Sequence, residues 1–112
     1  MKNFIIEQDS NKKDTGCIPQ ADVIYNLVMT GSAMKTVTVP TGANIAIFSA
    51  TGNFYCRFDA AVAVPAADIV DGTAGELNPV ARVARRVTSI NMISATDIIV
   101  TIAFYNVPYP QA

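Results

Sequence analysis

In NIAIFSATGNFYCRFD (residues 44–59), two short apolar runs flank the turn sequence Thr51-Gly52-Asn53. Both runs are rich in β-branched and aromatic residues, and each is too short for an ordinary helix. In the second run, the two-residue repeat of a strand places Phe54, Cys56 and Phe58 on one face. We therefore predict two consecutive β-strands, with this face of the second in the core.

Runs of the same kind lie on both sides of this stretch. They cover residues 22–29, 33–39, 86–94 and 97–107, and most of them end at turns that contain glycine or proline. Short strands at this spacing are typical of an antiparallel sandwich or barrel. The sequence therefore predicts an all-β fold, a single small antiparallel β-sandwich or jelly-roll-like domain.

The last run, DIIVTIAFYNV (97–107), is apolar on both of its faces. Ile98, Val100 and Ile102 share one face with Phe104, and the other face is only slightly more polar. A strand of this kind is typical of the centre of a sheet, or of a sheet whose outer face meets another subunit.

The first 21 residues differ from the rest of the chain. Their central part, EQDSNKKDTG (7–16), is polar, mixed in charge and rich in residues that break regular structure. Only Phe4, Ile5 and Ile6 form an apolar run, which could attach the segment to another surface. We predict an N-terminal extended arm over residues 1–21 that orders against a neighbour, followed by the β-sandwich domain over residues 22–112.

The composition indicates a protein that is covered by a partner. The net charge is −1, so no overall electric field attracts nucleic acid or an anionic membrane. Hydrophobic residues make up 51% of the chain and charged residues only 15%, which is more apolar than the surface of an ordinary monomer requires. We therefore expect self-association or another protein partner, and no nucleic-acid or membrane partner.

The start of the chain lacks the apolar run of a signal peptide, and the sequence contains no stretch long enough to span a membrane. We expect synthesis in the cytoplasm. Cys17 and Cys56 do not form a CxxC pair, and in a chain without an export signal two reduced thiols are the expected state.

The stretch PAADIVDGTAGELNPVARVARR (65–86) concentrates acidic and basic residues, but it does not match a metal-binding loop. Asp68 and Asp71 are three positions apart, and Glu76 follows too soon for the calcium loop of an EF-hand. The pair Asp71-Gly72 fits an ordinary turn. We therefore predict neither a metal nor a cofactor.

Catalysis is not expected either. The chain contains no histidine, which is the usual general base near neutral pH. Cys56 alternates with phenylalanines as a core residue, and a buried apolar thiol is inert. A small hydrolase would need two converging carboxylates, which no spacing in this sequence enforces. The prediction is a protein that is not an enzyme.

Three arginines, Arg82, Arg85 and Arg86, close the same stretch. On a helix that begins at Asn78-Pro79 they would share one face, but the β-branched residues around them favour a strand. Their flanks contain no aromatic residue on which a base could stack, so a nucleic-acid site is not favoured. The remaining interpretation places them at a subunit boundary, where arginine can bond a carboxylate across it with two parallel hydrogen bonds.

Two long runs, VTVPTGANIAIFSATGNFYCRFDAAVAVPAADIVDGTAGELNPVAR (37–82) and VTSINMISATDIIVTIAFY (87–105), resemble small structural proteins of tailed bacteriophages and prophages. The resemblance lies in a Gly-Asn-Phe-Tyr strand, an Ala-rich loop of the form VPAAD…DGT…ELNP and a terminal strand that ends in Phe-Tyr. It implies a head decoration protein with a small β-sandwich fold, which is often trimeric and binds the major capsid protein on the surface of the virion.

The expected function is therefore a capsid decoration, or cement, protein of a virion, assembled in the host cytoplasm as a homotrimer or another homo-oligomer. The predicted partner contacts are Phe4, Ile5, Ile6, Arg82, Arg85 and Arg86. The alternative is a fibre or baseplate module of a phage that binds a glycan or receptor. In that case exposed Tyr55, Tyr105 and Tyr109 would stack on sugars.

Overall fold

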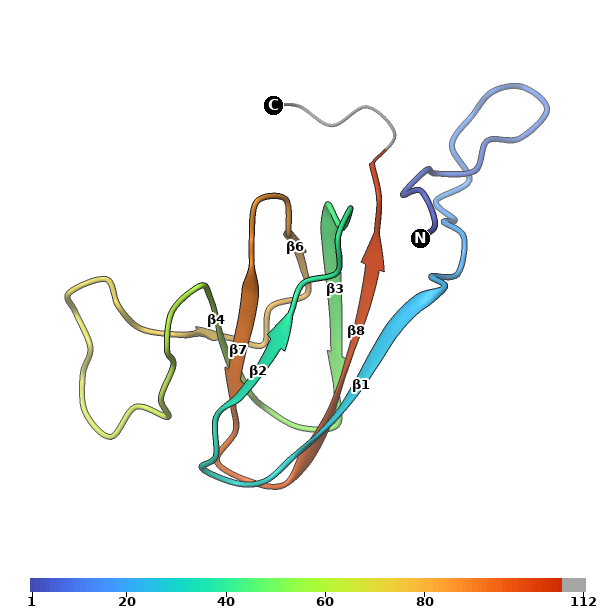
Figure 1. Cartoon of the computed structure of the whole chain (residues 1–112). Helices are drawn as coiled ribbons and strands as arrows, with labels where there is room; N and C mark the ends of the chain where they lie inside the picture. Colours follow the sequence, from blue (N-terminus) through green and yellow to red (C-terminus); the bar gives the residue numbers. More distant parts are fainter. Residues whose placement is uncertain (108–112) are drawn as a thin grey trace.

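The computed structural model describes residues 1–107 and contains eight β-strands and, within those residues, no helix (Figure 1). The strands are β1 (Val23–Met29), β2 (Lys35–Thr38), β3 (Ile45–Ala50), β4 (Tyr55–Phe58), β5 (Glu76–Leu77), β6 (Ala81–Val83), β7 (Ser89–Ile93) and β8 (Ile98–Tyr105). They form two antiparallel sheets of four strands, in the orders β1-β8-β3-β6 and β2-β7-β4-β5. The predicted all-β sandwich is confirmed.

The connectivity of the sandwich is that of a jelly roll. The first strand pairs with the last, β2 pairs with β7, β3 with β6 and β4 with β5, as in one long hairpin. Two further pairings, β3 with β8 and β4 with β7, roll this hairpin into the two sheets. Eight strands in two sheets with this nested order define the jelly roll among the antiparallel folds.

The core lies between the two sheets and is built by the alternation of the central strands. Val100, Ile102 and Phe104 of β8 and Ile90 and Met92 of β7 have no exposed surface. The face predicted from the opening stretch is confirmed. Phe54 and Cys56 are buried, and Phe58 packs against the same cluster.

The arm lies outside both sheets, at one end of the molecule (Figure 1). Its chain doubles back as a hairpin, in which the Glu7 amide donates to the Cys17 carbonyl at 2.7 Å. The arm lengthens the molecule, whose extents are 52 × 30 × 24 Å. The radius of gyration is 15.6 Å, compared with about 13 Å for a compact chain of this length.

Candidate interaction surfaces

One outer face of the sandwich carries only uncharged side chains. In the sheet β1-β8-β3-β6, alternation and register place one set of side chains on the side away from the core. We call this set the uncharged face; it comprises Ile24, Asn26, Val28, Ile45, Ile47, Ser49, Ala81, Val83, Ile99, Thr101 and Ala103. All of these belong to the described residues, and none of them carries a charge. Val28 is 69% exposed and Val83 is 60% exposed.

The register arranges the uncharged face in rows. Val28 lies opposite Ile99, and Ile24 lies opposite Ala103. Between these two apolar rows lies a polar one, in which the Thr101 hydroxyl donates to Oδ1 of Asn26 at 2.8 Å. The face is thus mostly apolar, with one row whose hydroxyl and amide groups already bond to each other.

The outer face of the other sheet is partly covered by the chain itself. The side chain of Asn91, on β7, is buried beneath the loop 59–75: its Nδ2 donates to the Ala60 carbonyl at 2.6 Å, and its Oδ1 accepts from the Thr36 hydroxyl at 2.6 Å. From β4, Nη1 of Arg57 donates to the Thr73 carbonyl at 2.8 Å. These polar bonds hold the loop against the sheet.

Asp59 fixes the beginning of this loop. Its Oδ1 accepts from the amides of Thr88 and Ser89, both at 2.9 Å. Its own backbone is left-handed, with a φ of 58°. Two bonds from amides to one carboxylate oxygen hold the backbone in a conformation that non-glycine residues rarely adopt.

Arg82 and Glu76 form an ion pair between the edge strands of the two sheets. Arg82 lies on β6 and Glu76 on β5; Nε donates to Oε1 at 2.9 Å, and Nη2 donates to Oε2. The bonds from Arg82 hold the pKa of the Glu76 carboxyl below its ordinary value and raise the pKa of Arg82 in turn. Arg82 therefore bonds a carboxylate of its own chain, whereas a pair across a subunit contact and the role of Arg82 as a partner contact stay predictions.

Arg85 and Arg86 lie in a turn, and the prediction of a strand across them is wrong. The Val87 amide donates to the Ala84 carbonyl at 3.1 Å, which closes a four-residue turn, and Arg86 has a φ of 65°. The chain crosses from one sheet to the other here, so it cannot continue as a strand, and β7 begins only at Ser89. Arg85 is half-buried and Arg86 is exposed.

The base of the arm is fixed to the end of β8. Phe4 packs edge-on against Tyr105, with ring centroids 5.5 Å apart, and the Phe4 amide donates to the Asn106 carbonyl at 2.7 Å. The Tyr105 hydroxyl donates to the Pro19 carbonyl at 2.8 Å. Tyr105 is therefore buried, and the prediction that it is exposed for sugar stacking is wrong because the arm covers it.

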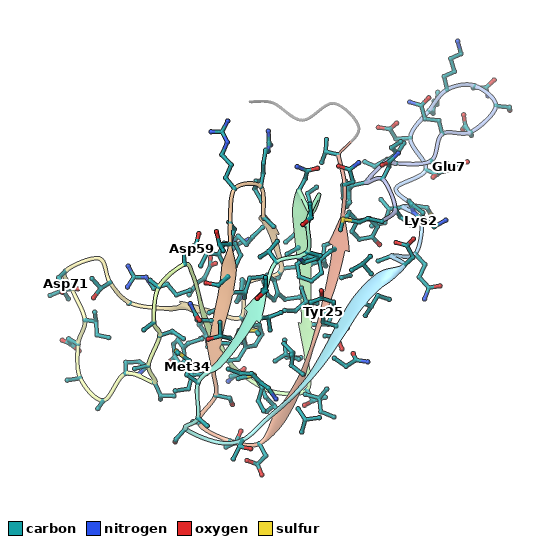
Figure 2. The ribbon with its side chains drawn as sticks, viewed as in Figure 1. Lys2, Glu7, Tyr25, Met34, Asp59 and Asp71 are labelled. Atoms are coloured by element: carbon teal, nitrogen blue, oxygen red, sulfur yellow. The ribbon has the colours of Figure 1, made fainter. Side chains whose placement is uncertain are left out.

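Beyond this anchor the arm leaves apolar side chains uncovered. Ile5 is 50% exposed and Ile6 is 41% exposed. An open hollow of about 450 Å³ lies between the two legs of the arm, with Ile5 on one leg and Ile18 on the other among its lining residues. Figure 2 shows Glu7, on this arm, at the opposite end of the molecule from Asp71 in the loop 59–75.

The remaining side chains that could react or bind a ligand lie apart from one another. Cys17 is exposed on the arm, whereas Cys56 is buried in the core, and both are free thiols. Burial raises the pKa of the Cys56 thiol to about 12. Tyr55 is half-buried, and Tyr109 lies outside the described residues. Within residues 1–107, no three side chains of the types His, Cys, Asp and Glu come together as a metal site would require.

The described residues include no helix long and apolar enough to cross a membrane. No protein-family model matches the chain, and neither the curated proteins nor the solved structures include a significant match.

Proposed function

We propose that this chain is a non-enzymatic decoration protein of a phage capsid, which binds the outside of the major capsid shell and stabilises it. The observation that carries the proposal is the arm, which projects from the sandwich with Ile5 and Ile6 exposed. Jelly rolls are common in viral capsid proteins, which supports the proposal as an analogy of fold.

The arm supplies the shell contact in this proposal. Burial of an isoleucine side chain contributes about 1.5–3 kcal/mol, so Ile5 and Ile6 together give a contact that is weak for one copy. Many copies on one shell, linked by their own association, convert weak contacts into stable occupancy. The major capsid protein is the partner, and the protein resides on the virion after synthesis in the host cytoplasm.

The experiment uses emptied heads of the virus whose genome encodes the chain. The purified protein is mixed with the heads and sedimented through a sucrose cushion, and the bound fraction is measured against concentration. We expect saturable binding by the wild type and a loss of at least tenfold in affinity for the double variant Ile5→Asp/Ile6→Asp. Both side chains are exposed, so the fold should persist, which circular dichroism checks.

The matched control is Val70→Asp. Val70 is 92% exposed, but it lies on the loop 59–75, away from the arm. This variant should bind like the wild type. Equal binding by all three proteins would refute the arm as the anchor, and an absence of binding by the wild type would refute the decoration proposal.

The glycan-binding alternative gives a different pattern. A glycan array would show a reproducible sugar ligand, and the protein would stay in the supernatant when mixed with empty heads. Because Tyr105 is buried, Tyr55 is the described tyrosine left to test from the predicted set, and Tyr55→Ala should then remove the signal.

A further inference from the structure

β1 is a long strand at the edge of its sheet. It has 7 residues, compared with 4, 3 and 2 for the other edge strands β2, β6 and β5. Within residues 1–107 no strand pairs with its outer side. Its sequence, VIYNLVM, has neither a charge nor a proline. Edge strands with these properties are ready templates for pairing with another chain.

The hydrogen bonds of β8 show which main-chain groups of β1 point outward. The amides of Asn44 and Thr51 donate to the carbonyls of Tyr105 and Ile99, so the odd-numbered residues of β8 bond toward β3. The even-numbered residues of β8 then bond toward β1, since main-chain bonds alternate along an antiparallel strand. Their partners are Val23, Tyr25, Leu27 and Met29.

The main-chain groups of the remaining residues, Ile24, Asn26 and Val28, therefore point to the free edge. A hydrogen bond from a side chain to one of these groups agrees with this orientation. Nζ of Lys35, on β2, donates to the Val28 carbonyl at 2.9 Å, which it reaches from outside the sheet. The other outward groups have no main-chain partner among the described residues.

The side-chain pattern of β1 is symmetric about Asn26. Ile24 and Val28, two positions away on either side, are both exposed on the uncharged face. Tyr25 and Leu27, one position away on either side, both point toward the core, where Tyr25 meets Phe104 with ring centroids 5.1 Å apart. An antiparallel copy of the strand centred on Asn26 would therefore place apolar side chains opposite apolar ones on each face.

We propose that β1 pairs antiparallel with β1 of a second copy of this chain, about a twofold axis at Asn26. Residues whose numbers add up to 52 are then opposite each other, so Ile24 faces Val28 of the second copy and Asn26 faces its own equivalent. The outward main-chain groups of β1 form the new ladder. Lys35 releases the Val28 carbonyl to an amide of the second copy. The sheet β1-β8-β3-β6 of one copy and the same sheet of the second copy then form one continuous sheet of eight strands.

Electrostatics and symmetry favour a second copy over an unrelated strand. Residues 23–29 contain no charge, so no like charges meet across the axis, and Asp22 lies opposite Thr30. β-branched pairs such as Ile24 with Val28 stabilise adjacent strands. The pairing also joins the two uncharged faces into one surface of double width.

The contact is modest in size, since one strand edge buries less than the roughly 800 Å² per partner of a standard stable interface. We therefore expect a dimer that dissociates on dilution. The proposal does not depend on the capsid function, because it concerns the chain alone.

The first test measures mass by sedimentation equilibrium over a range of concentrations. The wild type should pass from monomer to dimer, and Asn26→Lys should shift the midpoint to at least about tenfold higher concentration, because two like charges then face each other on the axis. The control is Ser49→Lys, which adds the same charge to the same face on β3, two strands from the edge. This control should dimerise like the wild type.

The second test reads the register by cross-linking in a Cys17→Ser background, which removes the exposed native thiol. Directly opposite residues are about 5.5 Å apart, whereas Ile24 and Ile24 of the second copy would be separated by about 14 Å along the strands. A short bismaleimide should therefore link Asn26→Cys to itself. It should link a mixture of Ile24→Cys and Val28→Cys much more than either variant alone.

Four results would overturn the proposal: a monomer at every concentration, a trimer, equal loss of association in both lysine variants, or cross-linking that ignores the register. Equal loss would indicate that the uncharged faces stack on each other instead. If Asn26→Lys fails to fold, the cross-linking pattern alone decides. A register-specific dimer that does not bind heads would leave this inference intact and refute only the decoration proposal.

Discussion

The two outer faces of the sandwich differ in the side chains that they carry and in what covers them. The sheet β2-β7-β4-β5 turns polar and charged side chains such as Asn91 and Arg57 away from the core, and the chain's own loop 59–75 bonds to them. The sheet β1-β8-β3-β6 exposes the uncharged face and, at its edge, a side of β1 with which no strand of residues 1–107 pairs. The longest loop of the chain thus bonds to the polar face, whereas side chains of the uncharged face such as Val28 and Val83 stay largely exposed.

Asn91→Ala, on the polar face, should have the largest effect on the free energy of unfolding. The change leaves the Ala60 carbonyl and the Thr36 hydroxyl without their partner and opens a buried space, which we expect to lower the free energy of unfolding by about 2–3 kcal/mol. Urea denaturation measures the change. Ser49→Ala, on the uncharged face, is the control and should change the same quantity by less than about 0.5 kcal/mol. Equal effects would mean that the two faces do not differ as described.

Gly75→Ala tests how closely the two ends of the loop 59–75 pack on each other and on Tyr55 of β4. A Cβ at position 75 would lie 2.5 Å from Cγ2 of Val62 and 3.2 Å from Cβ of Tyr55. We expect a loss of about 1–2 kcal/mol in the free energy of unfolding, as for other overpacked sites. Val62→Ala in the same chain should recover part of the loss, because it removes the closest obstacle. If Gly75→Ala costs nothing, the ends of the loop do not pack as closely as described.

The smallest expected effect on stability comes from the ion pair between Arg82 and Glu76, which joins the two sheets at their edges. The pKa of Glu76 is lowered in the folded protein, so its contribution to stability is present above its ordinary value of 4.5 and is lost as the pH falls through the lowered pKa. The melting temperature of the wild type should exceed that of Glu76→Gln by roughly 3 °C or less at pH 7, because exposed pairs contribute little. The difference should shrink between pH 5 and pH 3. A difference that grows on acidification would contradict the assignment.

Local alternation made much of the fold predictable. A period of two within a few residues predicts the core face of Phe54 and Cys56. The central place of the strand that ends at Tyr105 follows from the apolar residues on both of its faces. The sheet order could not be predicted, because it depends on pairs such as Val23 with Phe104 that are far apart in the sequence.

The wrong predictions also concern features that depend on residues far apart in the sequence. Arg85 and Arg86 are surrounded by β-branched residues, but the passage from one sheet to the other imposes a turn there. Tyr105 is buried because the arm, at the other end of the sequence, packs on it. The free edge of β1 had a local signal in its uncharged sequence, but only the pairing of the strands shows that it is an edge.

The nested pairing also sets the order in which the chain can fold during synthesis. β1 leaves the ribosome early, and its partner β8 is made last, 69 residues after the end of β1. At ordinary rates of translation this interval lasts about 3–14 s. Throughout it β1 has both of its edges free, and nascent copies on neighbouring ribosomes present the same strand to one another. Asn26, the polar residue at the centre of β1, then interrupts what would otherwise be a continuous apolar strand at the stage when aggregation is the greatest hazard.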